Sequence, residues 1–277
     1  MAAMVAAAGL AGMAAAGPVL PDFSPAEFVA GGPIDNPYFP LVPGTRYRYQ
    51  ARITDPETGE TIDELSENLV TFNTEVVGGA RARVVHARTW EDDILTEDTD
   101  DWFAQDKSGN VWYLGEATTA LEYDDDGNLT GTSHAGSWRA GVDGARPGYI
   151  MPADPQVGFN HYQEFAEAAD ALGQAEILAR GGSVSVPAGD FSGLLKIREF
   201  SESEPGIVEN KYYAPGVGLV FIEENLDAAG RPLNTISLQS VTVVPLPPAM
   251  WAAVTAWAVF LLSRIRRGAR SVTCSQG

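Results

Sequence analysis

The sequence predicts a mainly β fold: an antiparallel meander that forms a curved sheet or half-barrel, with at most one or two short helices and a single C-terminal transmembrane helix. Residues 46–53 alternate strictly between polar and apolar side chains, as in a half-buried antiparallel strand. Turn sequences follow one another at short intervals through residues 55–128. An uncharged apolar run at residues 249–262 precedes a basic tail, which is typical of a membrane span.

The composition limits the classes of function. Hydrophobic residues make up 45% of the 277 residues, which is enough for a sizeable core. There are 37 acidic and 18 basic residues, giving a net charge of −19. Nucleic acid is excluded as a partner, because phosphate binding needs a concentrated positive field. The single cysteine, Cys274, excludes an intramolecular disulfide and a cysteine-based metal cluster.

The first 43 residues divide into two predicted segments. Residues 1–16 contain no charged side chain and end in an alanine run before Gly17 and Pro18, as in a secretory signal peptide with a small-residue cleavage site. The positively charged leader of such peptides is missing, and an alanine-rich tail is the alternative. Residues 17–43 are rich in proline, so we expect a linker or a wrapping segment.

Residues 44–242 form the predicted antiparallel β ectodomain. Alternation places Tyr47, Tyr49, Ala51 and Ile53 on one face of the first strand. Turns are predicted around residues 55–59, 78–79, 106–110 and 124–128, and later strands at 183–186, 194–200, 208–213, 217–223 and 235–243. The apolar side chains of residues 165–179 fit a helical period that Gly173 interrupts, so one short helix is expected there.

The C-terminal segment, residues 243–277, has three parts. A proline motif precedes the apolar run, for which a transmembrane helix at residues 249–263 is expected. Arginines follow as a membrane stop signal and, by the positive-inside rule, place the tail in the cytoplasm. A buried core helix is the alternative, but the chain before the run carries −23 and the tail +4, as expected across a membrane boundary. The motif comprises Val244, Pro245, Leu246, Pro247, Pro248 and Ala249, and the stop signal Arg264, Arg266 and Arg267.

This three-part tail resembles the PEP-CTERM family of bacterial sorting signals, in its VPLPA-type variant. The matching residues are Val244 to Pro247 and, after one inserted proline, Ala249. The resemblance implies that an exosortase, a membrane-embedded processing enzyme, recognises the motif. It also implies a protein that is exported, anchored in the inner membrane by its C-terminus, and found at the cell surface or outside the cell after processing.

The ectodomain resembles bacterial envelope proteins built from one long curved antiparallel sheet, a half-barrel. Residues 36–44 and 212–220 carry this resemblance, because each combines aromatic residues with a Pro-Gly turn before a strand. In such proteins the concave face often holds something apolar. The resemblance implies a fold and no catalytic residues.

Acidic residues supply the candidate ligands for a metal ion. Seven crowd residues 91–101, and the turn at Asp124, Asp126 and Asn128 offers weak candidates for calcium, which prefers oxygen ligands. This turn lacks the EF-hand glycine and glutamate, and solvated acidic turns explain the residues equally well. The three histidines share no local spacing, so no zinc motif is present, although a site assembled in space stays open. No other cofactor is expected.

The sequence favours a non-enzymatic structural or binding module of the cell surface or matrix. We find no nucleophile, nucleotide or metalloprotease motif, and assign no catalytic residue. Six aromatic residues fall in predicted strands, where they fill a core or stack on sugars of an extracellular polysaccharide: Trp90, Trp102, Trp112, Tyr113, Tyr123 and Trp138. The alternative is an extracellular polysaccharide hydrolase that uses a pair of carboxylates.

Overall fold

The computed structural model describes residues 17–54, 59–124 and 126–244. Within these ranges the regular structure is antiparallel β-sheet apart from two short 3-10 helices, η1 (Pro25–Glu27) and η2 (Glu167–Ala169). The predicted mainly β, antiparallel class is therefore confirmed. The strands are β1 (Thr45–Thr54), β2 (Thr61–Val77), β3 (Ala80–Glu91), β4 (Ile94–Gln105), β5 (Val111–Tyr123), β6 (Leu129–Ser133), β7 (Trp138–Arg139), β8 (Arg146–Met151), β9 (Asn160–Tyr162), β10 (Glu164–Phe165), β11 (Gly173–Arg180), β12 (Ser183–Val186), β13 (Gly189–Ser192), β14 (Leu195–Ser201), β15 (Val208–Ala214), β16 (Gly218–Glu224) and β17 (Asn234–Val243).

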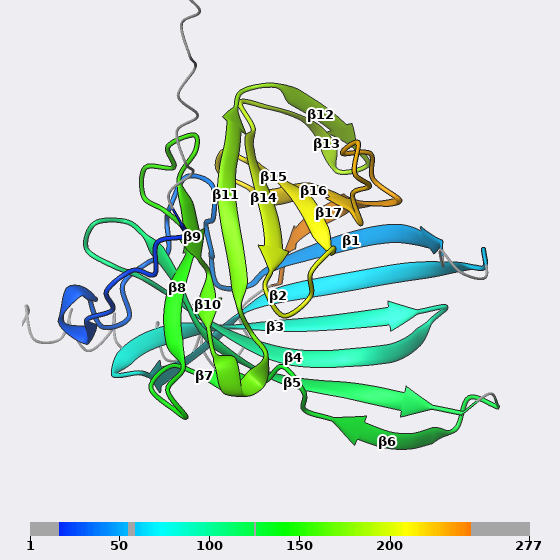
Figure 1. The fold of residues 1–277 in the computed structure, drawn as a ribbon, viewed down its shortest axis with the longest axis horizontal. Coiled ribbons are helices and arrows are strands. Elements are labelled where there is room, and N and C mark those ends of the chain that lie inside the picture. Colours follow the sequence, from blue (N-terminus) through cyan, green and yellow to red (C-terminus); the bar gives the residue numbers. More distant parts are fainter. Residues whose placement is uncertain (1–16, 55–58, 125, 245–277) are drawn as a thin grey trace, which may run out of the picture.

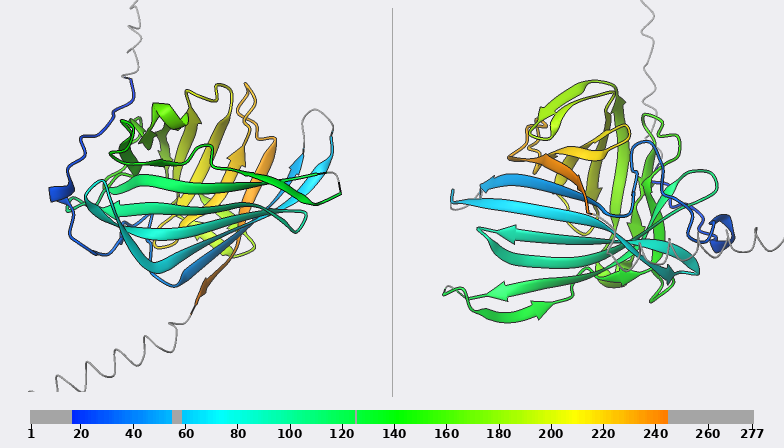
Figure 2. Two further views of the ribbon diagram at one scale, coloured as in Figure 1. Left: turned by 90° about the horizontal axis from the view of Figure 1, so that it is seen from below. Right: turned by 180° about the vertical axis from the view of Figure 1, so that it is seen from behind.

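A sheet of 15 strands forms the body of the protein. Its main path runs β10-β8-β5-β4-β3-β2-β1-β17-β16-β15-β14-β11-β9, and β6 and β7 also pair with β5. The hairpin β12–β13 forms a separate two-stranded sheet. The large sheet curls into a nearly closed barrel, with the long strands β1–β5 on one side and β11 and β14–β16 on the other (Figures 1 and 2).

The two ends of the strand path meet at one residue. The chain passes directly from β9 to β10 through Gln163, whose N–H donates to the Gly173 carbonyl at 2.9 Å and whose carbonyl accepts from the Gly148 N–H at 3.0 Å. A Cβ atom on Gly148 would lie 2.7 Å from the Tyr162 carbonyl carbon and 2.8 Å from that of Gln163. The close approach between the two ends of the strand path therefore requires glycine at this position.

The inner face of the sheet carries the larger apolar core. Tyr47, Tyr49 and Ala51 are buried and share this face, as the alternation in the sequence predicted, while Arg48 on the opposite face is exposed. Phe39 from the N-terminal segment packs into the same cluster, with ring centroids 5.3 Å from Phe103. The N-terminal segment thus fills one end of the barrel with aromatic side chains.

A second apolar cluster lies on the outer face of β3–β5. Trp112 and Trp102 are buried there, and Trp138 from β7, the register partner of Glu116, packs into the same cluster. Phe23 and Phe28 of the N-terminal segment cover Trp112, with ring centroids 5.4 and 6.0 Å away. The proline-rich segment therefore contacts the sheet on its outer face before it enters the inner core.

The predicted turns at residues 106–110 and 124–128 each close a hairpin. The Asp106 N–H donates to the Asn110 carbonyl at 2.9 Å between β4 and β5, and the Asp124 N–H donates to the Asn128 carbonyl at 3.0 Å between β5 and β6. The later predicted strands correspond to β12 and β14–β17. Local turn chemistry was sufficient to place these elements, because each needs only neighbouring residues.

The one short helix expected within residues 165–179 is present only as η2, and the helical period does not hold beyond it. Three residues form η2, which ends at Asp170 in the left-handed conformation, with φ 55°. Gly173 then begins strand β11, in which Ala175 and Ile177 are fully buried on the inner face. Pairing with β14 supplies hydrogen bonds to the backbone there. The segment therefore forms a strand, although the spacing of its small residues also fits a helix.

The predicted signal peptide at residues 1–16, the transmembrane helix at 249–263 and the arginine stop signal lie outside the described residues. Within the described part of the chain, no helix combines the length and the apolar character needed to cross a membrane.

Candidate functional site

Eight carboxyl side chains from seven strands surround the interior of the barrel and act on one another through their charges. Strand alternation turns several of them inward. Asp101 on β4 is the register partner of the buried Val85, and Glu199 on β14 is the partner of the buried Ala175. We call this set the inner carboxyl cluster: Glu64, Glu97, Asp101, Glu116, Glu164, Glu199, Glu209 and Glu224.

A bulge at Gly115 brings Glu116 into this cluster. Gly115 has φ 131°, and a Cβ atom there would overlap the Trp138 backbone. The register between β4 and β5 shifts at this point, so that Glu116 pairs with Asp101 and Tyr113 with Phe103. Simple alternation would turn residues 113 and 116 to opposite faces, but the extra residue brings both inward.

Burial raises the pKa values of several carboxyls in the cluster. It raises the pKa of Asp101 to about 8, assisted by the charges of Glu116, Glu97 and Glu164, although the Tyr113 hydroxyl donates to the Asp101 carboxylate at 2.7 Å and opposes the rise. Burial likewise raises the pKa of Glu164 to about 7. These groups therefore exchange protons near neutral pH and can act both as hydrogen-bond donors and as acceptors.

Lys211 is the cation that binds the cluster directly. Its Nζ lies 2.6 Å from Glu199 and 3.3 Å from Glu209. Burial opposes the charge on the lysine, but the two carboxylates outweigh burial and hold the lysine pKa well above its usual value. Glu199 also accepts hydrogen bonds from Tyr213 at 3.2 Å and Gln163 at 3.1 Å. The closing residue of the barrel is thus tied to the cluster.

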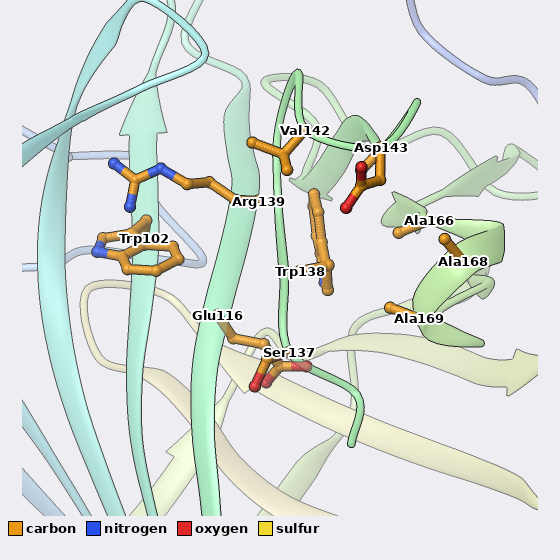
Figure 3. A pocket seen from close by; sticks show the side chains of 11 residues that line it. Trp102, Glu116, Ser137, Trp138, Arg139, Val142, Asp143, Ala166, Ala168 and Ala169 are labelled. Atoms are coloured by element: carbon orange, nitrogen blue, oxygen red, sulfur yellow. The ribbon is translucent and has the colours of Figure 1, made fainter. Parts of the chain in front are cut away.

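A pocket of about 280 Å³ adjoins the cluster at Glu116. We call it the tryptophan pocket, because Trp102 and Trp138 line it together with Arg139 and Asp143, and alanines near η2 form the facing side (Figure 3). The Trp138 indole N–H donates to Glu164 at 2.7 Å, which fixes the ring between pocket and cluster. The pocket thus combines aromatic walls with charged groups.

Arg139 is held in place at the edge of the tryptophan pocket. Its guanidinium carbon lies 4.7 Å from the centroid of the Trp102 ring, within range of a cation–π interaction. One guanidinium nitrogen lies 2.7 Å from Glu75 and donates to the Val76 carbonyl at 2.9 Å. These contacts preorganise the arginine, so a ligand would meet a side chain that has already lost much of its freedom.

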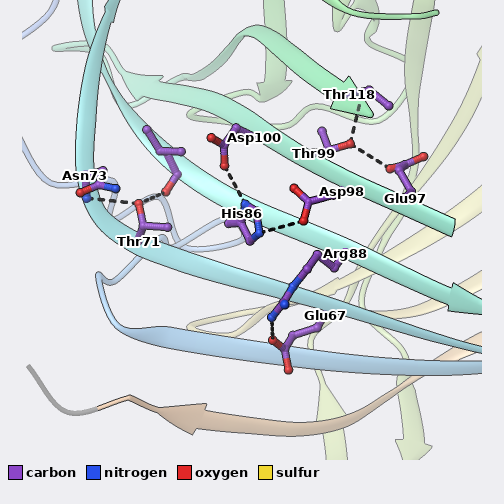
Figure 4. Close-up of polar contacts among 11 residues, drawn as sticks. Glu67, Thr71, Asn73, His86, Arg88, Glu97, Asp98, Thr99, Asp100 and Thr118 are labelled. Carbon is purple, nitrogen blue, oxygen red and sulfur yellow. Dashed lines mark hydrogen bonds and ion pairs between the residues drawn. The ribbon is translucent and has the colours of Figure 1, made fainter. Parts of the chain in front are cut away.

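The acid-rich stretch at residues 91–101 divides between the two faces of β4. Glu97 and Asp101 belong to the inner cluster, whereas Asp98 and Asp100 lie beside His86 on the outer face, at 3.5 and 2.8 Å (Figure 4). These outer acids therefore contact His86 at the surface and take no part in the inner cluster.

Further along the outer face, Glu67 is only 3% exposed and is paired with three arginines. Its carboxylate lies 3.4 Å from Arg46, 2.9 Å from Arg48 and 3.0 Å from Arg88 (Figure 4 shows the last contact). The three cations lower the pKa of Glu67 although burial raises it. This arrangement balances a buried charge and leaves no obvious role for a ligand.

The calcium candidates lie in the hairpin between β5 and β6. The Asp124 carboxylate accepts hydrogen bonds from the Asp126 N–H at 3.1 Å and the Asn128 N–H at 2.8 Å, and both its oxygens accept from the Asn128 side-chain amide. These contacts lower the pKa of Asp124 and use the carboxylate to shape the turn. Across the described ranges, no group of three His, Cys, Asp or Glu residues could hold a metal ion.

Of the sorting motif, only Val244 falls within the described residues, where its N–H donates to the Gly44 carbonyl at 2.6 Å. The inner cluster itself was not found from the sequence. Glu97 and Asp101 lie an even number of residues from Phe103, as Glu209 does from Tyr213, so alternation puts these acids on the same face as the aromatic residues. The sequence alone did not show that this face is the inner one.

No family model and no curated protein matches the chain. Among solved structures, it is similar to a protein of Bacteroides fragilis NCTC 9343 that is described as exported and as having a YmcC-like fold, with 12% identity, a TM-score of 0.40 and coverage of 74% of this chain and 98% of that chain. It is also similar to a protein of Parabacteroides distasonis ATCC 8503 that is described as a lipoprotein, with 15% identity, a TM-score of 0.36 and the same two coverages. Likenesses this distant carry no inference about function.

Proposed function

We propose that the protein is an exported, surface- or matrix-associated binding module that holds a unit of extracellular polysaccharide in the tryptophan pocket. The observation that carries the proposal is the composition of this pocket: two tryptophans, an arginine and two carboxyl groups around about 280 Å³. Aromatic walls suit the apolar faces of a sugar ring, and fixed charged groups suit its hydroxyls.

The tryptophans act as walls and not as exposed platforms, because Trp102 and Trp138 are only 6% and 5% exposed. Specificity would then come from the polar groups at the rim and base. Burial raises the pKa of Glu116, and Glu97 adds to the rise, so a proton on this carboxyl can be donated to a sugar oxygen. Asp143 also lines the pocket and is exposed, so its carboxylate would accept hydrogen bonds from sugar hydroxyls.

The test is a glycan array followed by titration of the best glycan against the full-length protein. Glu116→Gln and Asp143→Asn should each weaken binding at least tenfold, since each alters a polar group of the pocket. Asp93→Asn is the matched control, because Asp93 and Asp143 both have positive φ, 69° and 49°, in exposed turns. Absence of any bound glycan, or binding that neither pocket variant weakens, would refute the proposal.

A polysaccharide hydrolase is the second candidate, and the pairing of Asp101 with Glu116 favours it. These carboxyls are register partners on neighbouring strands, and burial raises both pKa values, as a general acid requires. New reducing ends from the bound glycan, abolished by Glu116→Gln, would establish the hydrolase. If the glycan stays intact, the binding module remains.

We also propose that the C-terminal tail directs the protein through an exosortase. Val244 to Ala249 would be recognised, the run from Ala249 would span the membrane, and the following arginines would stop transfer, since each arginine at mid-bilayer costs about 2.5–3.5 kcal/mol. Pro245→Ala with Pro247→Ala should leave full-length protein in the membrane fraction, and truncation after Val243 should release soluble protein. If mass spectrometry of fractionated cells shows the double variant processed like wild type, the tail is only an anchor.

A further inference from the structure

A second cavity lies inside the barrel, between the sheet and the N-terminal segment. It has a volume of about 100 Å³ and is separate from the tryptophan pocket, with which it shares no lining residue. Five aromatic residues and one carboxyl dominate its wall: Phe39, Tyr47, Tyr49, Phe103, Tyr213 and Asp101. We call it the aromatic cavity.

The tyrosine hydroxyls of the aromatic cavity already have partners. Tyr49 donates to the Leu219 carbonyl at 3.1 Å, Tyr47 to the Pro40 carbonyl at 3.4 Å, and Tyr213 to Glu199 at 3.2 Å. These bonds hold the rings in place and occupy their polar ends. The cavity therefore offers a ligand aromatic and aliphatic carbon, and its polar lining residues are Asn68 and Asp101.

The electrostatic surroundings of Asp101 are negative. Glu97, Glu116 and Glu164 all act on it, and the Tyr113 hydroxyl is a neutral donor. None of the residues that line the aromatic cavity is a lysine or an arginine. Lys211, the cation of the inner cluster, is engaged by Glu199 and Glu209. An anion would be repelled from this cavity, and a cation would be attracted.

We propose that the aromatic cavity binds a small organic ammonium ion, with its charged head among the aromatic rings and against the Asp101 carboxylate. Aromatic rings attract cations through their quadrupole, and such rings around a carboxylate recognise alkylated ammonium groups. A metal ion would find too few oxygens, because Asp101 is the only carboxyl among the lining residues. This site is independent of the proposed binding of polysaccharide.

Binding should be coupled to release of a proton. The Asp101 pKa of about 8 means that much of the empty site holds a proton at pH 7. An ammonium ion stabilises the carboxylate, so the carboxyl ionises and its proton passes to the buffer. Affinity should therefore increase from pH 6 to pH 9. The carboxyls that act on Asp101 are Glu97, Glu116 and Glu164, and their further ionisation with rising pH acts in the same direction. Tyr113 and the three tyrosines that share the cavity wall, Tyr47, Tyr49 and Tyr213, keep their protons over this range, because burial raises their pKa values.

The experiment compares choline with 3,3-dimethylbutan-1-ol, its uncharged isostere, by calorimetry on the full-length protein. Choline should bind at least tenfold more tightly than the alcohol. Titrations at pH 7 in two buffers with different heats of ionisation should reveal the released proton. Equal binding of the two probes would show an apolar cavity and overturn the proposal, as would a lack of choline binding at millimolar concentration.

Variants separate the contribution of the carboxylate from that of the fold. Asp101→Asn keeps the shape and can still accept from Tyr113, and should weaken choline at least tenfold and remove proton release. Asp100→Asn is the matched control on the outer face and should bind as wild type does. Unaltered binding in Asp101→Asn would overturn the assignment. The glycan titration at the tryptophan pocket is read separately, so failure of either proposal is recognisable.

Discussion

Replacing Asp101 by Asn should make the protein more stable at alkaline pH. The folded protein raises the pKa of Asp101 from 3.8 to about 8, and burial is the main cause. Between these two values the folded state keeps a proton that the unfolded chain has lost. The free energy of unfolding therefore falls as the pH rises from about 4 to about 8. Asparagine cannot ionise, so the variant avoids this loss.

The size of the effect follows from the difference in pKa. Each pKa unit is worth about 1.4 kcal/mol, so the full difference sets an upper limit of about 6 kcal/mol. Asp101 keeps part of its surface in contact with solvent, and it titrates together with neighbouring acids. Both effects reduce the free-energy cost of ionising it in the folded protein. We expect a gain of about 2 kcal/mol at pH 9, a large effect for one substitution in a protein of this kind.

Chemical denaturation at pH 4, 6, 8 and 9, followed by circular dichroism, measures this gain. The difference between Asp101→Asn and wild type should be near zero at pH 4 and should grow with pH. The Asp100→Asn control should show no such growth between pH 6 and 9. A difference that is independent of pH, or a variant that loses stability as the pH rises just as wild type does, would refute the assignment of a buried proton to Asp101.

Three further predictions concern the stability of the protein. Gly148→Ala should cost about 1–3 kcal/mol of stability. Gly131→Ala is the control and should cost less, because its new Cβ meets only the end of the Glu122 side chain at 3.0 Å. Equal melting temperatures of the two variants would contradict the requirement for glycine at position 148. Lys211→Met should destabilise the protein by an amount near the low end of about 3–5 kcal/mol, because Glu199 and Glu209 lose their cation; a variant as stable as wild type in urea at pH 7 would show that the pair is dispensable. Adding a thiol should leave the melting temperature unchanged, because Cys274 is the single cysteine; a shift of several degrees would count against this.

Local pattern was sufficient to predict the strands and hairpins. The alternation at Tyr47 and Tyr49 reflects a strand with one face in the core and one in water, and this difference is written into neighbouring residues. Local pattern also explains why the helical period of residues 165–179 holds for η2 and misleads over β11. Small apolar residues fit a helix and a buried strand equally well, and only the partner strand β14, which lies about twenty residues further along the chain, decides between them.

The candidate site could not be predicted, because it depends on register across many strands. Asp100 and Asp101 are adjacent in the sequence, yet one pairs with His86 outside and the other lines the aromatic cavity inside. Glu116 joins Asp101 only because the Gly115 bulge reverses the parity of β5. A chain with 37 acidic residues offers many carboxyl pairs, and the sequence does not say which of them converge.

The polarity of the interior follows from how the barrel is filled. The N-terminal segment inserts Phe39 into the apolar core, while the inner faces of several strands also carry carboxyls. Asp101 lies at the boundary, with aromatic rings on one side and the acids of the cluster on the other. A carboxyl in this position is costly to ionise and costly to leave without a partner. The Tyr113 hydroxyl supplies the hydrogen-bond partner. A bound proton, or a bound cation, removes the free-energy cost of leaving the charge unbalanced. The same position that destabilises the empty protein at high pH is thus the position that would favour a cationic ligand.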